Sequence, residues 1–124
     1  MKISDLGAVA ERYLAAWAAH DLDAIVALHS ADGVFRLHTG GAPAIGRDAV
    51  RSAFAAILEQ FPALTVQVHR VLLGDRHWVL DWTLVSGQRR LDCLDLVELS
   101  DAGLVARKDT FVDAAQLPAA LGAA

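Results

Sequence analysis

Residues 76–99, RHWVLDWTLVSGQRRLDCLDLVEL, contain two apolar segments separated by a short polar turn. On both sides of Ser86-Gly87 the side chains alternate with a period of two, which is the pattern of a β-hairpin. One face of the first segment carries only large apolar residues: Trp78, Leu80, Trp82 and Leu84. A connection this short requires antiparallel neighbours, so the stretch predicts the centre of an antiparallel sheet.

The same period continues on both sides of this hairpin. Strands are predicted at 64–73, 76–85, 89–99 and 104–112, with an earlier short strand at 33–38 and a Gly/Pro loop at 39–46. Before the main strands the spacing is helical. Helices are expected over 6–18, capped by Ser4 or Asp5, over 22–28, capped by Asp21, and from Arg47 or Asp48 to Pro62, with a short helix or tail at 113–124. Helices followed by an antiparallel meander predict an α+β domain.

Composition limits the kind of protein. The 124 residues are 55% hydrophobic and 21% charged, which predicts one globular domain over residues 1–124. A net charge of −4, without a basic aromatic patch, argues against a nucleic-acid partner. The single cysteine, Cys93, cannot form an internal disulfide and is typical of a reducing compartment. No long apolar run predicts a signal peptide or membrane span, so a cytoplasmic location without membrane contact is expected.

The aspartates of the second strand lie on opposite faces, because they are three residues apart. Asp92 shares its face with Glu98, whereas Asp95 shares the more apolar one, with Leu91, Cys93, Val97 and Leu99. A carboxylate removed from water costs several kcal/mol unless it is paired or protonated. Asp95 is therefore a candidate functional residue.

Apolar residues occupy both faces of strand 76–85, since Val79 and Val85 alternate with the tryptophan face. The outer face of the sheet is therefore expected to be covered as well. A second copy of the chain is the simplest cover, so a homodimer through this face is predicted.

Three segments resemble a known superfamily: RYLAAWAAHDLDAIVALHSADGVF (12–35), IGRDAVRSAF (45–54) and LDCLDLVELSDAGLV (91–105). They are similar to the ketosteroid isomerase branch of the nuclear-transport-factor-2-like superfamily. That superfamily also contains SnoaL-type polyketide cyclases and limonene epoxide hydrolase. The resemblance runs from about residue 12 to 113. It implies a cone-shaped α+β barrel, in which three N-terminal helices pack on a strongly curved, mostly antiparallel sheet around an apolar pocket.

The resemblance also implies catalytic positions. Tyr13 falls on the family's tyrosine donor, and Asp95 falls on its protonated acid, which together bind the oxyanion of an enolate. The general-base position falls on Leu37, which cannot move a proton. The neighbouring His38 is the candidate base, provided that the strand turns its imidazole inward.

Other positions leave alternatives open. The family's tyrosine network falls on His29 and Phe54, although His29 at a helix end is also expected as an imidazolium that meets the helix dipole. Epoxide hydrolase and cyclase members carry working acids on the last strand. A gapless strand places Lys108 inside and turns Asp109 outward, whereas a one-residue bulge reverses the two.

Inward positions predict the ligand-contacting surface. The tryptophans would provide flat apolar walls, suited to a planar cyclic ligand rather than a sugar or phosphate. The expected contacts are Trp17, Phe54, Leu58, Trp78, Leu80, Trp82, Cys93, Lys108, Thr110 and Val112. The five histidines lack metal-ligand spacing, so no metal or cofactor is assigned.

Together these features predict a small-molecule enzyme. Tyr13 and Asp95 would stabilise an enolate while His38 moves a proton, giving isomerisation or cyclisation of a small apolar carbonyl compound. One alternative is a non-catalytic small-ligand binding protein. The other is an epoxide-hydrolase-like or dehydratase-like enzyme that uses Asp109.

Overall fold

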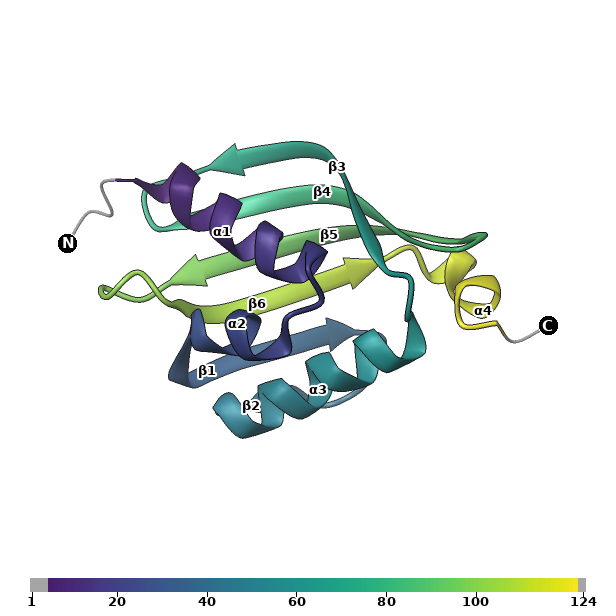
Figure 1. Cartoon of the computed structure of the whole chain (residues 1–124), viewed down its shortest axis with the longest axis horizontal. Helices are drawn as coiled ribbons and strands as arrows, with labels where there is room; N and C mark the ends of the chain where they lie inside the picture. Colours follow the sequence, from purple (N-terminus) through teal and green to yellow (C-terminus); the bar gives the residue numbers. More distant parts are fainter. Residues whose placement is uncertain (1–4, 123–124) are drawn as a thin grey trace.

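A computed structural model describes residues 5–122 of the chain as helices packed on one face of a sheet (Figure 1). In this part of the chain the sheet has six strands in the order β2-β1-β6-β5-β4-β3. The strands are β1 (His29–His38), β2 (Ala44–Ile45), β3 (Thr65–Leu73), β4 (His77–Ser86), β5 (Arg89–Leu99) and β6 (Val105–Val112). The helices are α1 (Leu6–Ala18), α2 (Leu22–Ala27), α3 (Arg47–Gln60) and α4 (Leu117–Ala120), the last preceded by a 3-10 turn at Ala114–Gln116.

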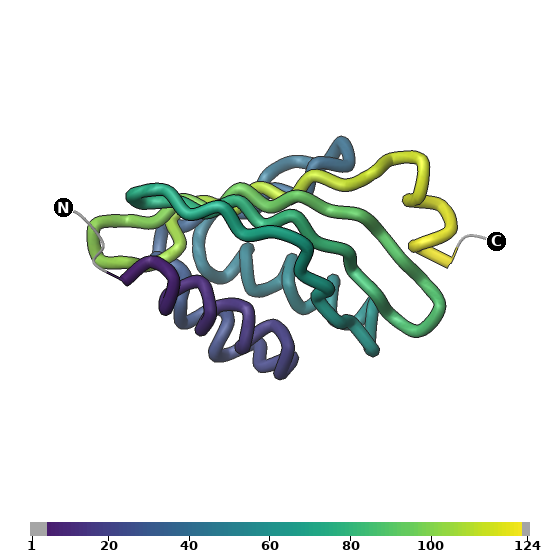
Figure 2. Tube along the Cα trace, turned by 90° about the horizontal axis from the view of Figure 1, so that it is seen from above, coloured from purple at the N-terminus to yellow at the C-terminus, as the bar shows by residue number. Residues whose placement is uncertain are grey.

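The predicted α+β class and the mostly antiparallel, curved sheet are confirmed. Pairs β3–β4, β4–β5 and β5–β6 are antiparallel, as their short turns require. Turned by 90°, the molecule shows α1, α2 and α3 on one side of the bent sheet (Figure 2). The sheet does not close into a barrel, because β2 and β3 remain as its two edges.

The first strand differs from the sequence-based prediction. It begins at His29 rather than at residue 33. Residues 29–33, which were expected to interrupt the chain between helix and strand, form the start of the strand instead, and its pairing with β6 is irregular between His29 and Val34. Gly33 permits this close packing: a Cβ there would lie 3.0 Å from the Ser30 carbonyl oxygen and 3.2 Å from that of Val105. β1 pairs in parallel with β6, a contact that local patterns did not predict.

Short polar residues start the first two helices, as expected. The Asp5 carboxylate accepts a hydrogen bond from the Ala8 N–H at 3.1 Å, and Asp21 does the same for Ala24 at 3.1 Å. Ser4, the alternative first cap, lies outside the described residues. The third helix ends before Pro62, which cannot continue it.

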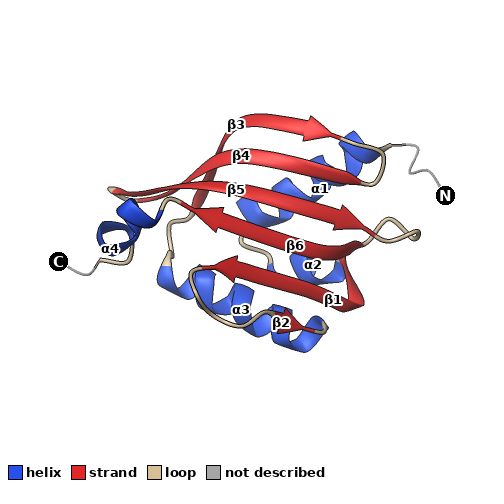
Figure 3. Ribbon diagram, turned by 180° about the vertical axis from the view of Figure 1, so that it is seen from behind, coloured by secondary structure: helices blue, strands red, loops and turns tan. Residues whose placement is uncertain are grey.

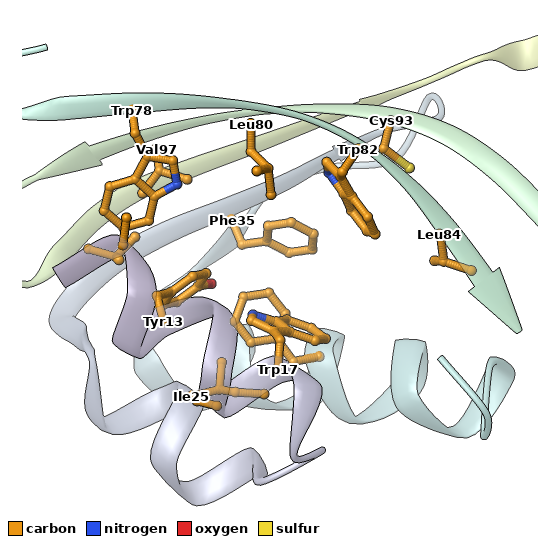
Figure 4. Packing of buried hydrophobic residues seen from close by; sticks show 14 of the residues in the cluster. Tyr13, Trp17, Ile25, Phe35, Trp78, Leu80, Trp82, Leu84, Cys93 and Val97 are labelled. Atoms are coloured by element: carbon orange, nitrogen blue, oxygen red, sulfur yellow. The ribbon is translucent and has the colours of Figure 1, made fainter. Parts of the chain in front are cut away.

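Inward residues of neighbouring strands form rows beneath the helices. Cross-strand partners give the rows Trp78–Val97–Lys108–Phe35, Leu80–Asp95–Thr110–Leu37, Trp82–Cys93–Val112 and Leu84–Leu91. Tyr13 and Trp17 of α1 face these rows across the space between the sheet and the helices (Figure 4). The core therefore lies between one sheet face and the helices, and the charged side chains of these rows, Lys108 and Asp95, are confined to the first two.

The opposite sheet face carries none of the helices α1 to α3 (Figure 3). Leu94 and Phe111 are exposed there, among charged side chains such as Arg107 and Asp81. Pairing of two copies through this face stays a prediction. Within residues 5–122, no helix is both long enough and apolar enough to cross a bilayer.

Candidate active site

A largely apolar cavity lies between the sheet rows and the helices. It has a volume of about 70 Å³. Its polar lining residues are Tyr13, Asp95, Lys108 and Thr110, with Cys93 and the two indoles of Trp17 and Trp82 nearby in the wall. Its apolar lining comes from α1, α3 and all the long strands: Leu14, Phe35, Leu37, Phe54, Ile57, Phe61, Leu64, Val66, Trp78, Leu80, Leu84, Leu91 and Val112.

The cavity brings together most of the residues expected to contact a ligand. Of that predicted set, every member lines the cavity except Leu58. Leu58 packs partly buried against the core, while its neighbour Ile57 turns into the cavity. Lys108, Thr110 and Val112 face inward, as the gapless interpretation of the last strand predicted, because the irregularity in β6 comes before Lys108.

Lys108 is the central charged group of the cavity. Its side chain is only 6% exposed, and Nζ lies 3.7 Å from Asp95 Oδ2 and donates a hydrogen bond of 3.3 Å to the Tyr13 hydroxyl. Four aromatic rings surround the ammonium at 4.7–5.9 Å from their centroids: Tyr13, Trp17, Phe35 and Phe54. Burial lowers the pKa of Lys108, but Tyr13 and Asp95 raise it more, so the pKa lies above its ordinary value.

Asp95 is buried, as its strand position indicated, but its partners are not those expected. The Thr110 hydroxyl donates to Asp95 Oδ1 at 2.7 Å, and the Lys108 ammonium faces Oδ2. No direct hydrogen bond joins Asp95 to Tyr13 among the described residues; Lys108 lies between them. The expectation of an uncharged acid assumed a face without a cation. Lys108 supplies one, and Thr110 adds a hydrogen bond.

The Thr110–Asp95 hydrogen bond should contribute measurably to stability. We expect Thr110→Val to lower the free energy of unfolding by about 1–3 kcal/mol, because valine fits the same space and leaves one buried carboxylate oxygen unpaired. Urea titration would measure the loss. Thr39→Val, on the loop after β1, is the control and should change stability by less than about 0.5 kcal/mol. Equal effects of the two substitutions would contradict this role for Thr110.

Tyr13 contacts His29 as well as Lys108. The Tyr13 hydroxyl and His29 Nε2 are 2.9 Å apart, and both side chains are buried. Burial raises the pKa of Tyr13, opposed in part by Lys108 and by the nearby Trp17 indole. Burial lowers the pKa of His29 to about 3, with Lys108 and Arg47 acting in the same direction. The expectation of a helix-end imidazolium is therefore wrong: His29 begins β1 and is neutral at pH 7.

The proton of His29 decides what Tyr13 can do. His29 Nδ1 is buried without a partner. We assign the ring proton to Nε2, since an unpaired acceptor is tolerated better than an unpaired donor in a protein interior. His29 then donates to the Tyr13 oxygen, and the Tyr13 O–H is free to donate into the cavity.

His38 and Asp109 lie on the outer face of the sheet, away from the cavity. His38 Nε2 is 2.8 Å from Asp109 Oδ1, and the imidazole stacks on Phe111 at 3.9 Å. Arg107 donates two hydrogen bonds to Asp109, at 2.8 and 3.0 Å. Burial raises the pKa of Asp109, but these partners lower it more, to below its ordinary value. The bend that would turn His38 inward is absent, since Leu37 lines the cavity instead.

Donors exceed acceptors inside the cavity. Lys108 uses one of its three N–H groups for a hydrogen bond to the described residues, and the indole N–H groups of Trp17 and Trp82 are buried without partners. Only Asp95 Oδ2 offers a free acceptor of comparable strength. The cavity is therefore suited to a ligand that brings oxygen acceptors and no strong donors of its own.

Neither a metal centre nor a reactive thiol emerges from residues 5–122. No cluster of three or more His, Cys, Asp or Glu side chains in that range could hold a metal ion. Burial, followed by the charge of Asp95, raises the pKa of the Cys93 thiol to about 12. Cys93 is therefore an apolar wall residue at neutral pH.

Sequence reasoning missed the residues whose contacts depend on helix placement. Phe35 and Phe61 line the cavity although no strand or helix period distinguished them from ordinary core. Leu84 and Leu91 could have been included, since they continue the inward alternation of their strands. The unpaired indole donors have no signature in the sequence.

Comparison with known proteins agrees with this architecture. The SnoaL-like domain family matches residues 10–108. A steroid delta-isomerase from Pseudomonas aeruginosa superposes with a TM-score of 0.77 at 24% identity, covering 98% of this chain and 89% of that one. A SnoaL-like protein of unknown function from Burkholderia thailandensis gives 0.78 at 16%, covering 91% and 98%. A Catenulispora acidiphila protein with a ketosteroid isomerase-like fold gives 0.76 at 16%, covering 92% of each.

These structural likenesses lie below 25% identity and speak for the fold. No curated protein matches the sequence. The family match covers most of the chain, and the helices and open curved sheet match the fold of the same superfamily. The chain therefore belongs to the SnoaL-like domain family, within the nuclear-transport-factor-2-like superfamily.

Proposed function

We propose that the protein is a small-molecule enzyme that transfers a proton on an apolar carbonyl compound bound in the cavity. The observation that supports this most directly is the buried Lys108–Asp95 pair, 3.7 Å apart, inside a cavity with otherwise apolar walls. A buried ion pair contributes little to stability on average, and apolar replacements are often as stable. A charged pair that faces an apolar cavity is more characteristic of an active site than of a structural ion pair.

The pair divides the reaction into two roles. The ligand's carbonyl oxygen would lie against the spare N–H groups of Lys108 and the free O–H of Tyr13. Asp95 Oδ2, which accepts no hydrogen bond from described residues, would then take a proton from the adjacent carbon. The C–H electron pair moves onto the carbonyl oxygen as an enolate, and Lys108 stabilises that negative charge.

Return of the proton from Asp95 to another carbon would complete an isomerisation. Attack of the enolate carbon on a second carbonyl, whose oxygen then takes the proton back from Asp95, would complete a cyclisation. Asp95 replaces His38 as the base in this proposal, since the structure places His38 on the other face. Asp109 also lies on the outer face, so its carboxylate does not reach the cavity as a hydrolase or dehydratase mechanism would require.

Deuterium exchange tests the proton transfer without knowledge of the natural substrate. After binding of 1-tetralone is confirmed by tryptophan fluorescence, NMR in deuterated buffer would follow exchange of the hydrogens beside its carbonyl. We expect the wild type to accelerate exchange and Asp95→Asn to lose about 10²–10⁴-fold of that acceleration, the usual contribution of a general base.

Asp109→Asn is the matched control, because it removes an equally buried carboxylate on the opposite face. It should exchange at the wild-type rate. Tight binding of tetralone without accelerated exchange would instead favour the non-catalytic binding protein. Loss of exchange in Asp109→Asn but not in Asp95→Asn would show that Asp95 is not the base.

A further inference from the structure

The cavity beside Lys108 is smaller than the ligands proposed for it. Its volume is about 70 Å³. An engineered apolar cavity that binds a single benzene ring has about 150 Å³. A two-ring compound such as 1-tetralone therefore needs additional space outside this cavity, and the neighbouring surface shows where that space lies.

A groove of about 360 Å³ lies next to the cavity, between α3 and the segment that runs from the end of β1 to β2. One wall is a single face of α3, whose lining residues are spaced three and four apart. The other wall comes from β1, the loop after it and β2. The lining is mostly apolar: Phe35, Leu37, Thr39, Gly41, Ala42, Ala44, Ala53, Ala56, Ile57, Gln60, Phe61 and Leu121.

A partition of single side chains separates the groove from the cavity. Four residues line both spaces: Phe35, Leu37, Ile57 and Phe61. The two phenylalanines are buried, whereas Leu37 and Ile57 are half-buried. Side chains that are partly exposed change rotamer within nanoseconds. The Leu37–Ile57 part of the partition is therefore the part that a ligand can displace.

The groove is within reach of a ligand whose oxygen is held at Lys108. Lys108 Nζ lies 3.7 Å from Asp95 Oδ2. Asp95, Thr110 and Leu37 are cross-strand partners on the neighbouring strands β5, β6 and β1. Neighbouring strands are about 4.8 Å apart, so Leu37 lies roughly 10 Å from Asp95 across the sheet. One ring with a short chain, or two fused rings, covers that distance.

We propose that the groove is the second compartment of the binding site, and that the ligand is an elongated carbonyl compound with an apolar tail. The oxygen end binds at Lys108, and the tail passes between Leu37 and Ile57 into the groove. The inference rests on the proposed function only in placing the oxygen end. The small side chains of Ala42 and Ala56, on opposite walls of the groove, then determine how long a tail the protein accepts.

A series of phenols tests this arrangement. Phenol, para-ethylphenol, para-butylphenol and para-hexylphenol place a lengthening chain opposite the oxygen. Once the chain reaches the groove, we expect the affinity of the wild type to rise about three- to fourfold per added methylene, the usual effect of burying that group. Absorbance of the bound phenol, followed against pH, measures each affinity and shows whether the oxygen is ionised.

Two substitutions narrow the groove from opposite sides. Ala42→Phe and Ala56→Phe replace exposed side chains that line the groove and not the cavity. In each variant the gain per methylene should fall below about twofold for the butyl and hexyl compounds, because their chains stay in water. Ala27→Phe is the matched control. It places the same side chain at an exposed position of α2, outside both spaces, and should keep the wild-type gain.

Nuclear Overhauser effects give a second measurement that needs no substitution. With carbon-13-labelled alanine methyl groups, the terminal methyl of para-hexylphenol should contact the methyl groups of Ala53 and Ala56 on α3. It should not contact the buried methyl groups of Ala10 and Ala16 on α1. Contacts with α1 instead would place the tail at another end of the cavity and overturn the proposal.

The outcomes separate this inference from the proposed function. If the phenols bind as phenolates but their affinity does not rise with chain length, the groove is not part of the site, while Lys108 keeps its role. An undiminished rise in both groove variants has the same meaning. If the rise is present in the wild type and absent from both variants, although the bound phenol stays neutral, the groove is supported and the oxyanion role of Lys108 fails.

Discussion

Lys108→Met is expected to lower the affinity of the cavity for ionised 2-naphthol by about 10²–10³-fold, the cost of one preorganised donor at a developing oxyanion. The wild type should bind the phenolate in preference to the neutral phenol, because the spare N–H groups of Lys108 lie in a cavity with mostly apolar walls. Methionine fits the aromatic surroundings without charge. Absorbance of the bound naphthol, followed against pH, distinguishes the two forms and measures the affinity of each.

Arg107→Met is the matched control for this experiment. It removes one positive charge from the adjacent position of the same strand, but its side chain lies on the outer face with Asp109. Naphthol affinity should stay within about twofold of wild type. A similar loss in both variants would show that net charge, rather than the position of Lys108, governs binding.

Stability must be followed in parallel, because Lys108→Met leaves the Asp95 carboxylate without its cation. Breaking a buried ion pair on one side costs about 3–5 kcal/mol, whereas replacing both partners by apolar residues is often neutral. The double variant Asp95→Leu/Lys108→Met should therefore regain stability and still fail to bind phenolate. That combination separates loss of the fold from loss of the site.

Acid is expected to destabilise the protein through His29, well above the pH at which carboxylates titrate. The pKa of His29 is about 3 in the folded state against 6.5 for an ordinary histidine. Between these values the unfolded chain binds the extra proton, so stability falls as pH falls, by about 1.4 kcal/mol per unit. From pH 6.5 to about 4.5 the loss should approach about 2–3 kcal/mol.

His29→Gln supplies the comparison, since glutamine can still donate to Tyr13 but does not titrate. Urea unfolding at several pH values should show that the slope above about pH 4.5 is strongly reduced in this variant. Asp92 and Asp109, whose pKa values lie below the ordinary 3.8, contribute only at lower pH. An unchanged slope in His29→Gln would mean that the buried imidazole is not the group that titrates.

The sequence was sufficient for the helices, for strands β3 to β6 and for one face of the sheet, whereas β1 begins earlier than predicted and β2 lies in the segment predicted as a loop. Period-two alternation in residues 76–99 placed Trp82 and Asp95 inside, because each strand has only two faces and one is clearly apolar. The sequence left two alternatives for the last strand, and the gapless one had brought Lys108 into the predicted lining, where the structure has it. Local patterns suffice when the choice is between two orientations.

Contacts between distant segments were not accessible in this way. The position of Lys108 between Tyr13 and Asp95 depends on how α1 packs over β6. Lys108 and Tyr13 are 95 residues apart in the sequence. The prediction for His38 was wrong for a related reason. The resemblance located the catalytic position at Leu37, and the regular pairing of β1 from Val34 to His38 turns the His38 side chain outward.

The place of β6 in the sheet has a consequence for biosynthesis. Within the described sheet this strand, the last in the sequence, pairs with both β1 and β5 and so joins the β2-β1 pair to the β5-β4-β3 meander. A nascent chain that has emerged only through β5 can form the meander hairpins, but its two sheet fragments have no partner to join them. Its exposed apolar rows would then be substrates for chaperones until Val105–Val112 leaves the ribosome and inserts.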